Sequence, residues 1–220
     1  MAFTFRFLLS AAAVLCLAHG APAAAQPGQD PPYPPLAGAD AEAIRAVVRE
    51  YQQAASRRDG AATSRLVTRD TRGYYARMRD LAVYAPEGAV RAMPLMDRVM
   101  VLMYRHRVPA DELRAMVADS AFAYTIDSGW VSGDLGDDVA SQGEIYGEGD
   151  LAILRLAGED IHFLREDGAW RWDMVPMLQA ASAEFAPDPD SGMTEDEFLM
   201  FILRYSNGTE PSPDIWRPLP

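Results

Sequence analysis

Three polar residues in the later part of the chain combine the side-chain types of a general acid–base site. The sequence on both sides of Asp167-Gly168 alternates between apolar and polar residues, and this dipeptide is typical of a two-residue hairpin turn. Such a turn pairs His162 with Asp173, and a second two-residue turn at Gly158-Glu159 would place Arg155 opposite His162. A carboxylate beside an imidazole fixes its tautomer and favours its protonated form, so the pair can transfer protons. The predicted catalytic residues are therefore Arg155, His162 and Asp173; the alternative is an ordinary solvated sheet face.

The other face of the same hairpin is apolar and is expected to pack against the core, because residues paired on neighbouring strands share a face. Its residues are Ile161, Phe163, Trp170, Trp172 and Met174. Arg165 lies opposite Trp170 in this register, which predicts a cation–π contact. One aromatic residue of an earlier helix joins the predicted ligand-binding set, which is Tyr51, Phe163, Trp170 and Trp172.

The composition excludes several kinds of chemistry. The 220 residues include 20 basic side chains, all of them Arg, with one Cys, three His and a formal net charge of −12. A chain without Lys has no Schiff-base nucleophile and no phosphate-loop lysine. A single Cys and scattered His give no zinc signature, so we expect no metal and no cofactor. The negative charge repels phosphate, which makes nucleic acid a poor partner.

The first 25 residues are expected to be a secretory signal peptide. Arg6 precedes an apolar run at 7–18, and three Ala at 23–25 provide the small residues that signal peptidase accepts. A transmembrane anchor is the alternative, but the run is shorter than the roughly 20 residues of a helical span. Cleavage after residue 25 predicts a periplasmic or secreted protein without membrane insertion.

The pattern of helices followed by a local run of strands and further helices predicts an α+β fold with an antiparallel sheet. A Pro-rich leader at 26–38 precedes a long helix with Asp40 as its N-cap. Strands are expected at 150–157, 160–166 and 169–175, followed by a helix that begins after Pro176. Thr194 and Glu197 form the capping box of a last helix.

These elements are expected to form one domain at 39–205. A helical insert at 70–128 carries a Met-rich stripe, which is more typical of a core than of a binding surface. The tail at 206–220 is expected to be docked by Trp216.

Two segments of the chain resemble the nuclear-transport-factor-like superfamily, which includes ketosteroid isomerases, dehydratases and polyketide cyclases as well as non-catalytic secreted domains. They are the opening helix at 41–58 with its closing Asp59-Gly60, and the hairpin at 161–173 with its acidic-Gly turn before Trp170. The resemblance implies a curved sheet packed on a long N-terminal helix, which together form a cone. The helices at 71–126 depart from the family pattern, and no residue takes the position of the isomerase Asp or Tyr.

The sequence therefore predicts an exported binding or interaction module, whose cone takes a small apolar ligand or a protein partner. An isomerase- or dehydratase-type enzyme that uses His162 or a carboxylate as general base is the first alternative. The second is an accessory protein that binds its partner through the insert at 70–128.

Overall fold

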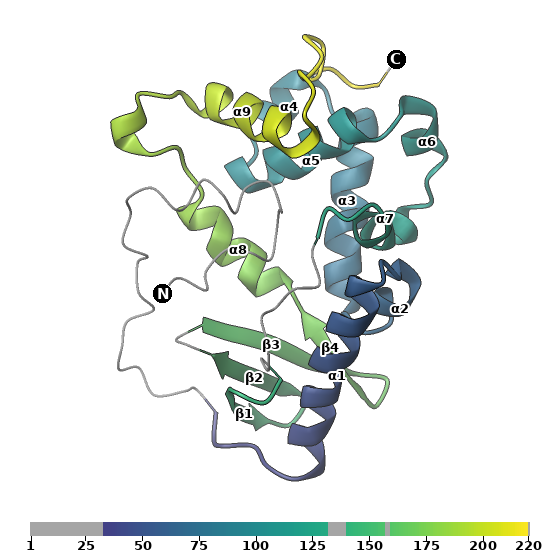
Figure 1. Ribbon diagram of the computed structural model, residues 1–220, viewed down its shortest axis with the longest axis vertical. Helices are drawn as coiled ribbons and strands as arrows, with labels where there is room; N and C mark the ends of the chain where they lie inside the picture. Colours follow the sequence, from purple (N-terminus) through teal and green to yellow (C-terminus); the bar gives the residue numbers. More distant parts are fainter. Residues whose placement is uncertain (1–32, 132–139, 157–158, 220) are drawn as a thin grey trace. The chain divides into compact units, whose positions relative to one another are not determined.

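The computed structural model describes residues 33–131, 140–156 and 159–219. The predicted signal peptide at 1–25 and most of the predicted leader at 26–38 lie outside this part of the chain. The described residues divide into two compact units (Figure 1): unit 1 holds 33–72 and 122–177, and unit 2 holds 73–121 and 178–219. The domain expected at 39–205 contributes residues to both. The fold class is α+β, as predicted.

Unit 1 begins with the long helix α1, Ala39–Ser56. Its buried residues include Ile44, Val48 and Tyr51, a spacing that places one apolar face of the helix against the core. This face packs against the last strand of the sheet (Figure 1). The predicted packing of the opening helix on the sheet is therefore confirmed.

The prediction of Asp40 as the N-cap is wrong. Gly38 is the N-cap, with a φ of 72°, and Asp40 lies in the first helical turn. Its carboxylate accepts a hydrogen bond from the Trp170 indole at 3.1 Å and pairs with Arg165 at 2.7 Å. Asp40 therefore connects the start of α1 to the hairpin, where its charge is also favourable for the helix dipole.

The sheet of unit 1 is a four-stranded antiparallel meander in the order β1-β2-β3-β4. The strands are β1 Glu144–Glu148, β2 Leu151–Leu156, β3 Glu159–Glu166 and β4 Ala169–Asp173. Asp167 and Gly168 connect the last two strands with φ angles of 52° and 77°, as a two-residue turn of type I′ requires. The predicted hairpin is thus confirmed, with Phe163 opposite Trp172 and Arg165 opposite Trp170.

Short backbone bridges cover both edges of this sheet. Pro35 pairs with Tyr146 on β1, and Val67 pairs with Trp172 on β4. The described part of unit 1 also contains the short helix α2, Gly60–Ser64, and most of α7, Ala121–Asp127. Paired edges leave fewer backbone groups open to another chain.

Three helices have residues in both units: α7, whose first residue Ala121 belongs to unit 2, α3, Arg69–Tyr84, and α8, Val175–Glu184. Helix α8 begins one residue before Pro176 rather than after it, so the strand predicted at 169–175 ends at Asp173. Proline is tolerated there because the first helical turn has no intrahelical acceptor for its missing N–H.

Unit 2 is helical within the described residues. Its helices are α4 Glu87–Arg91, α5 Leu95–Arg107, α6 Ala110–Ala115 and α9 Glu195–Asn207, with 3-10 turns at Ala118–Ser120 and Pro189–Ser191. Helices α5 and α9 lie side by side (Figure 1). Met96, Met100 and Met103 on α5 are buried, so the Met-rich stripe belongs to the core.

The last helix begins and ends as its sequence predicts. The Thr194 and Glu197 side chains form the capping box, and Gly208 follows the helix in the left-handed conformation with a φ of 66°. The predicted docking of Trp216 is also confirmed: this side chain is buried under the Arg91 guanidinium, 3.9 Å from its ring centroid.

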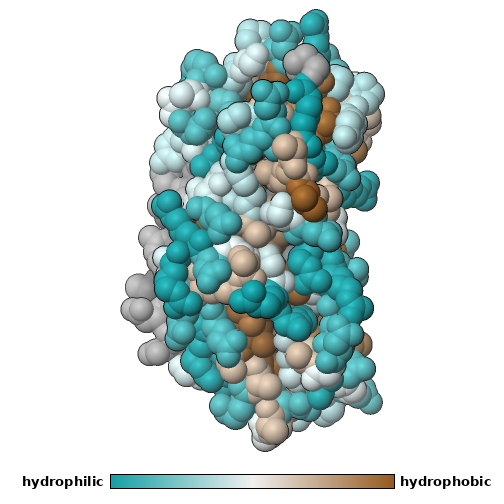
Figure 2. Space-filling view, turned by 90° about the vertical axis from the view of Figure 1, so that its right-hand side faces the viewer, coloured by the Kyte–Doolittle hydropathy of each residue, from teal (hydrophilic) through white to brown (hydrophobic). Residues whose placement is uncertain are grey.

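The surface shown in Figure 2 is largely hydrophilic, with small apolar areas between charged side chains. None of the helices in the described ranges is long and apolar enough to cross a bilayer.

Candidate functional site

The predicted catalytic row is only partly assembled on the sheet. His162 lies opposite Asp173 on β4, as predicted. Its neighbour on β2 is Ile153, and Arg155 lies opposite Asp160, with which it forms two hydrogen bonds of 2.7 and 2.8 Å. The prediction of Arg155 opposite His162 is therefore wrong. Leu156 pairs with Glu159, so the connection begins one residue earlier than expected, and this moves the partner of His162 by two residues.

Asp173 supports local backbone structure. Its Oδ1 accepts hydrogen bonds from the Thr68 hydroxyl at 3.3 Å and from the Val175 amide at 3.2 Å, at the start of α8. Among the described residues, no hydrogen bond joins this carboxylate to His162. The pair is adjacent in register without the contact that would orient the imidazole, and a catalytic role for it stays a prediction.

The predicted ligand-binding aromatics lie together between α1 and the sheet. The rings of Tyr51 and Trp172 meet edge to face with centroids 4.8 Å apart, and Phe163 stacks beside Trp172 at 6.5 Å. Trp170 has the predicted cation–π contact with Arg165 at 4.5 Å. All four aromatic side chains are buried, so they form core packing, and a ligand role for them stays a prediction.

A different site, absent from the sequence prediction, lies in unit 2. An open pocket of about 620 Å³ is formed by the end of α5 and the C-terminal tail, residues 209–219. We call it the tail pocket. Its polar side chains are His106, Thr209, Glu210, Ser212, Asp214 and Arg217, and its apolar ones are Ile215, Pro218 and Leu219.

Arg105 holds the wall of the tail pocket in place. Its Nη1 donates to the carbonyls of Ile215 and Trp216 at 3.1 and 2.7 Å. Its Nε and Nη2 donate to the carbonyls of Ala82 at 2.8 Å and Ala85 at 2.6 Å, near the end of α3, with a longer contact to Leu81. All five N–H groups thus bind backbone oxygen, and the guanidinium connects the tail to the end of α3.

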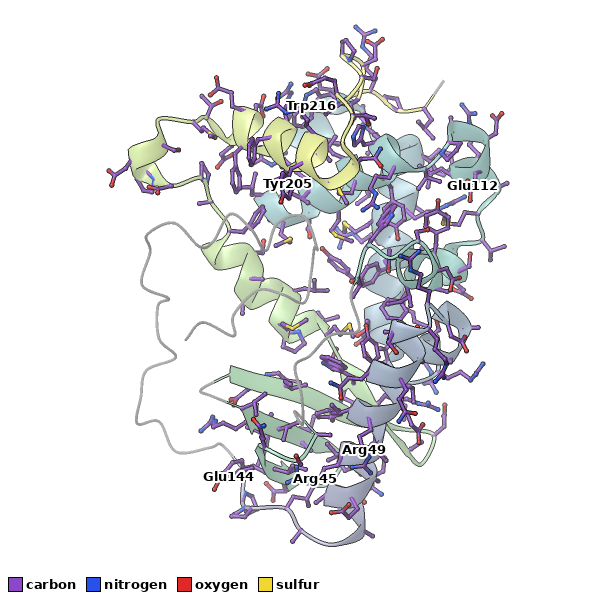
Figure 3. The ribbon with its side chains drawn as sticks, viewed as in Figure 1. Arg45, Arg49, Glu112, Glu144, Tyr205 and Trp216 are labelled. Carbon is purple, nitrogen blue, oxygen red and sulfur yellow. The ribbon has the colours of Figure 1, made fainter. Side chains whose placement is uncertain are left out.

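Burial lowers the pKa of Arg105 to about 10, so the group stays protonated at neutral pH. A backbone hydrogen bond from Leu219 to Val83, 3.2 Å long, attaches the tail to α3 a second time. Trp216, which belongs to the tail and is labelled in Figure 3, is the third anchor through its contact with Arg91. The pocket wall is therefore formed by an ordered segment, although that segment has no helix or strand.

The rim of the tail pocket carries charges of both signs. Glu210 pairs with Arg204 at 3.1 Å, and Asp214 pairs with Arg217 at 3.1 Å, in each case with more than half of the side chain exposed. His106 lies 3.5 Å from the Thr209 hydroxyl. Burial and then the neighbouring Arg107 lower the pKa of His106, which favours the neutral imidazole.

This arrangement presents hydrogen-bond donors, acceptors and an apolar wall to a small molecule. Within the described ranges no group of His, Cys, Asp or Glu side chains is placed to hold a metal ion. The only sequence signal for the tail pocket is the expected docking of Trp216, because the pocket side chains follow no periodic pattern.

Comparison of the chain with protein-family models, with curated proteins and with solved structures finds no match.

Proposed function

We propose that this protein is an exported binding module that takes a small ligand in the tail pocket. The observation that carries the proposal is the pocket itself, which charged side chains of both signs line together with apolar residues of the tail that Arg105 holds. Ligand sites combine this kind of concave shape with a few oriented polar groups. Export is proposed from the sequence alone, on the apolar run at 7–18 and the small residues before position 26.

The enzyme alternative has less support. Asp173, the carboxylate expected beside His162, is engaged by Thr68 and by the backbone of α8. An imidazole that acts as general base is oriented by a hydrogen bond to its carboxylate, and among the described residues no hydrogen bond joins Asp173 to His162. Binding, which needs no proton transfer, is the function that the geometry supports best.

Native mass spectrometry of the protein purified from its own host tests the proposal. We expect a small molecule to be retained by the natural chain and lost from Ser212→Trp, whose indole fills the tail pocket. Ser191→Trp is the matched control, because Ser191 is another exposed serine of unit 2 and does not line the pocket. The proposal is wrong if the natural chain retains nothing, or if Ser212→Trp retains the same molecule.

A further inference from the structure

The charged side chains that line the tail pocket indicate which class of small molecule it binds. The ligand class inferred below rests on the proposed function, because it concerns the small molecule that the proposed site takes. Arg105 lines the pocket, but its five N–H groups all donate to backbone carbonyls. It therefore adds a positive charge to the pocket without donating a hydrogen bond to a ligand. The groups that can contact a ligand are therefore those on the rim and on the apolar wall.

The cationic rim group is Arg217. Its side chain is 70% exposed, and its ion pair with Asp214 has a contact of 3.1 Å from Nη1 to Oδ1. The remaining N–H groups of the guanidinium fork match the two oxygens of a carboxylate. Arg217 is therefore the group expected to bind a ligand carboxylate.

The anionic rim groups are Glu210 and Asp214. Glu210 contacts Arg204 through Oε1, and Asp214 contacts Arg217 through Oδ1, each at 3.1 Å. The second oxygen of each carboxylate can accept a hydrogen bond from a ligand ammonium group, which has three donors. The Ser212 hydroxyl lies between them in the sequence and can donate as well.

Other ligand classes fit this rim less well. A simple anion would meet two carboxylates in a chain whose net charge is −12. A simple cation would meet the guanidinium of Arg217, and a purely apolar molecule would cover the rim charges without pairing them. A molecule with both charges pairs with both kinds of rim group.

We infer that the tail pocket binds a small zwitterion of the α-amino-acid class with an apolar side chain. The ligand carboxylate contacts Arg217, its ammonium group contacts Glu210 and Asp214, and its side chain lies on Leu219 and Pro218. The charges of the ligand and the rim are complementary, and the apolar wall selects the side chain.

Isothermal titration calorimetry with L-leucine, N-acetyl-L-leucine and L-leucinamide tests the inference on the mature protein. We expect L-leucine to bind with a Kd of about 1 mM or lower, and the other two, which each lack one charge, to bind at least about tenfold more weakly. Arg217→Gln should weaken L-leucine at least tenfold and leave L-leucinamide unchanged. Asp214→Asn should weaken L-leucine and leave N-acetyl-L-leucine unchanged.

A matched control comes from the same unit. Asp111 and Arg114 form another exposed ion pair at the same i,i+3 spacing, 3.2 Å long, and neither lines the tail pocket. Asp111→Asn and Arg114→Gln should leave L-leucine binding unchanged. Equal binding of L-leucine and N-acetyl-L-leucine, or L-leucine binding that survives both rim substitutions, overturns the inference.

The outcomes distinguish a wrong ligand class from a wrong proposed function. If none of the three probes binds but the natural chain retains another molecule that Ser212→Trp loses, the ligand class is wrong and the proposed function stands. If no probe binds and nothing is retained, both are wrong.

Discussion

Arg105 is the side chain whose removal should most affect the tail. Arg105→Met keeps the aliphatic length and the packing but removes all five donors. The carbonyls of Ala82, Ala85, Ile215 and Trp216 then lose hydrogen bonds of 2.8, 2.6, 3.1 and 2.7 Å from a charged group. Hydrogen bonds from charged donors contribute about 1.5–3 kcal/mol each when they act independently.

The expected cost is smaller than the sum of such values. Arg105 is only half-buried, so water can reach some of the released carbonyls, and donors of one guanidinium are not independent. The length of the Leu81 contact, 3.3 Å, also makes it weak. We therefore expect the free energy of unfolding to fall by about 3 kcal/mol, the range of a broken buried polar network.

Urea denaturation followed by circular dichroism measures this change, and hydrogen exchange locates it. The amide of Leu219, which binds the Val83 carbonyl, should lose more protection than the amides of β3. Arg105→Lys keeps the charge with only three donors and should recover part of the loss. Arg49→Met, at an exposed position of α1 labelled in Figure 3, is the control and should change stability by less than about 0.5 kcal/mol. A change below about 1 kcal/mol in Arg105→Met, or unchanged protection of the tail, would refute the role assigned to this guanidinium.

Three further predictions concern backbone conformation, helix capping and pH. Gly168→Ala should lower the free energy of unfolding by about 1 kcal/mol, because the φ of Gly168 is 77°. Gly73→Ala should raise it by about 0.5 kcal/mol, because Gly73 lies in helix α3 with open space at the Cβ position. Chemical denaturation of both variants measures the two effects. Thr194→Ala removes the capping box of α9 and should cost about 1 kcal/mol, measured as a lower Tm, and an unchanged Tm would argue against the cap. The hydrogen bond from Trp170 and then the Arg165 guanidinium lower the pKa of Asp40 below 3.8. The contribution of Asp40 to stability is therefore present above pH 3.8 and is lost as the pH falls through the lower folded-state pKa. Asp40→Asn should flatten this part of the acid-denaturation curve, and a curve parallel to that of the natural chain would contradict the role given to Asp40.

The hairpin was predictable because local and tertiary signals agree there. Asp167 and Gly168 both adopt positive φ, which the sequence signals directly, and the alternation of Phe163, Trp170 and Trp172 fixes which face is buried. The preceding connection has no such signal. A single Gly in the stretch fits two loop positions, and the choice of one over the other decides which residue faces His162.

The tail pocket was not predictable, because the sequence around Arg105 already has a local explanation and gives no sign that Arg105 binds the tail. Arg105 closes α5 together with two further basic residues, a pattern that complements the negative end of a helix. Its actual partners are carbonyls 20–24 residues earlier and 110–111 residues later in the chain. Nothing in a periodic pattern reports such a contact, since backbone carbonyls carry no residue identity.

The absence of Lys has a structural consequence that composition alone does not show. Arg45 binds the carbonyls of Ala140 and Gly143 ahead of β1. Arg72 binds those of Ser64, the last residue of α2, and Val67, and Arg79 binds those at the end of α6. Arg105 does the same for α3 and the tail. In each case one planar guanidinium reaches two or more backbone carbonyls, a geometry that a single ammonium group satisfies less well. Arginine is thus the residue whose hydrogen bonds connect the irregular segments to the helices and strands. The wall of the tail pocket is held by one such residue, Arg105.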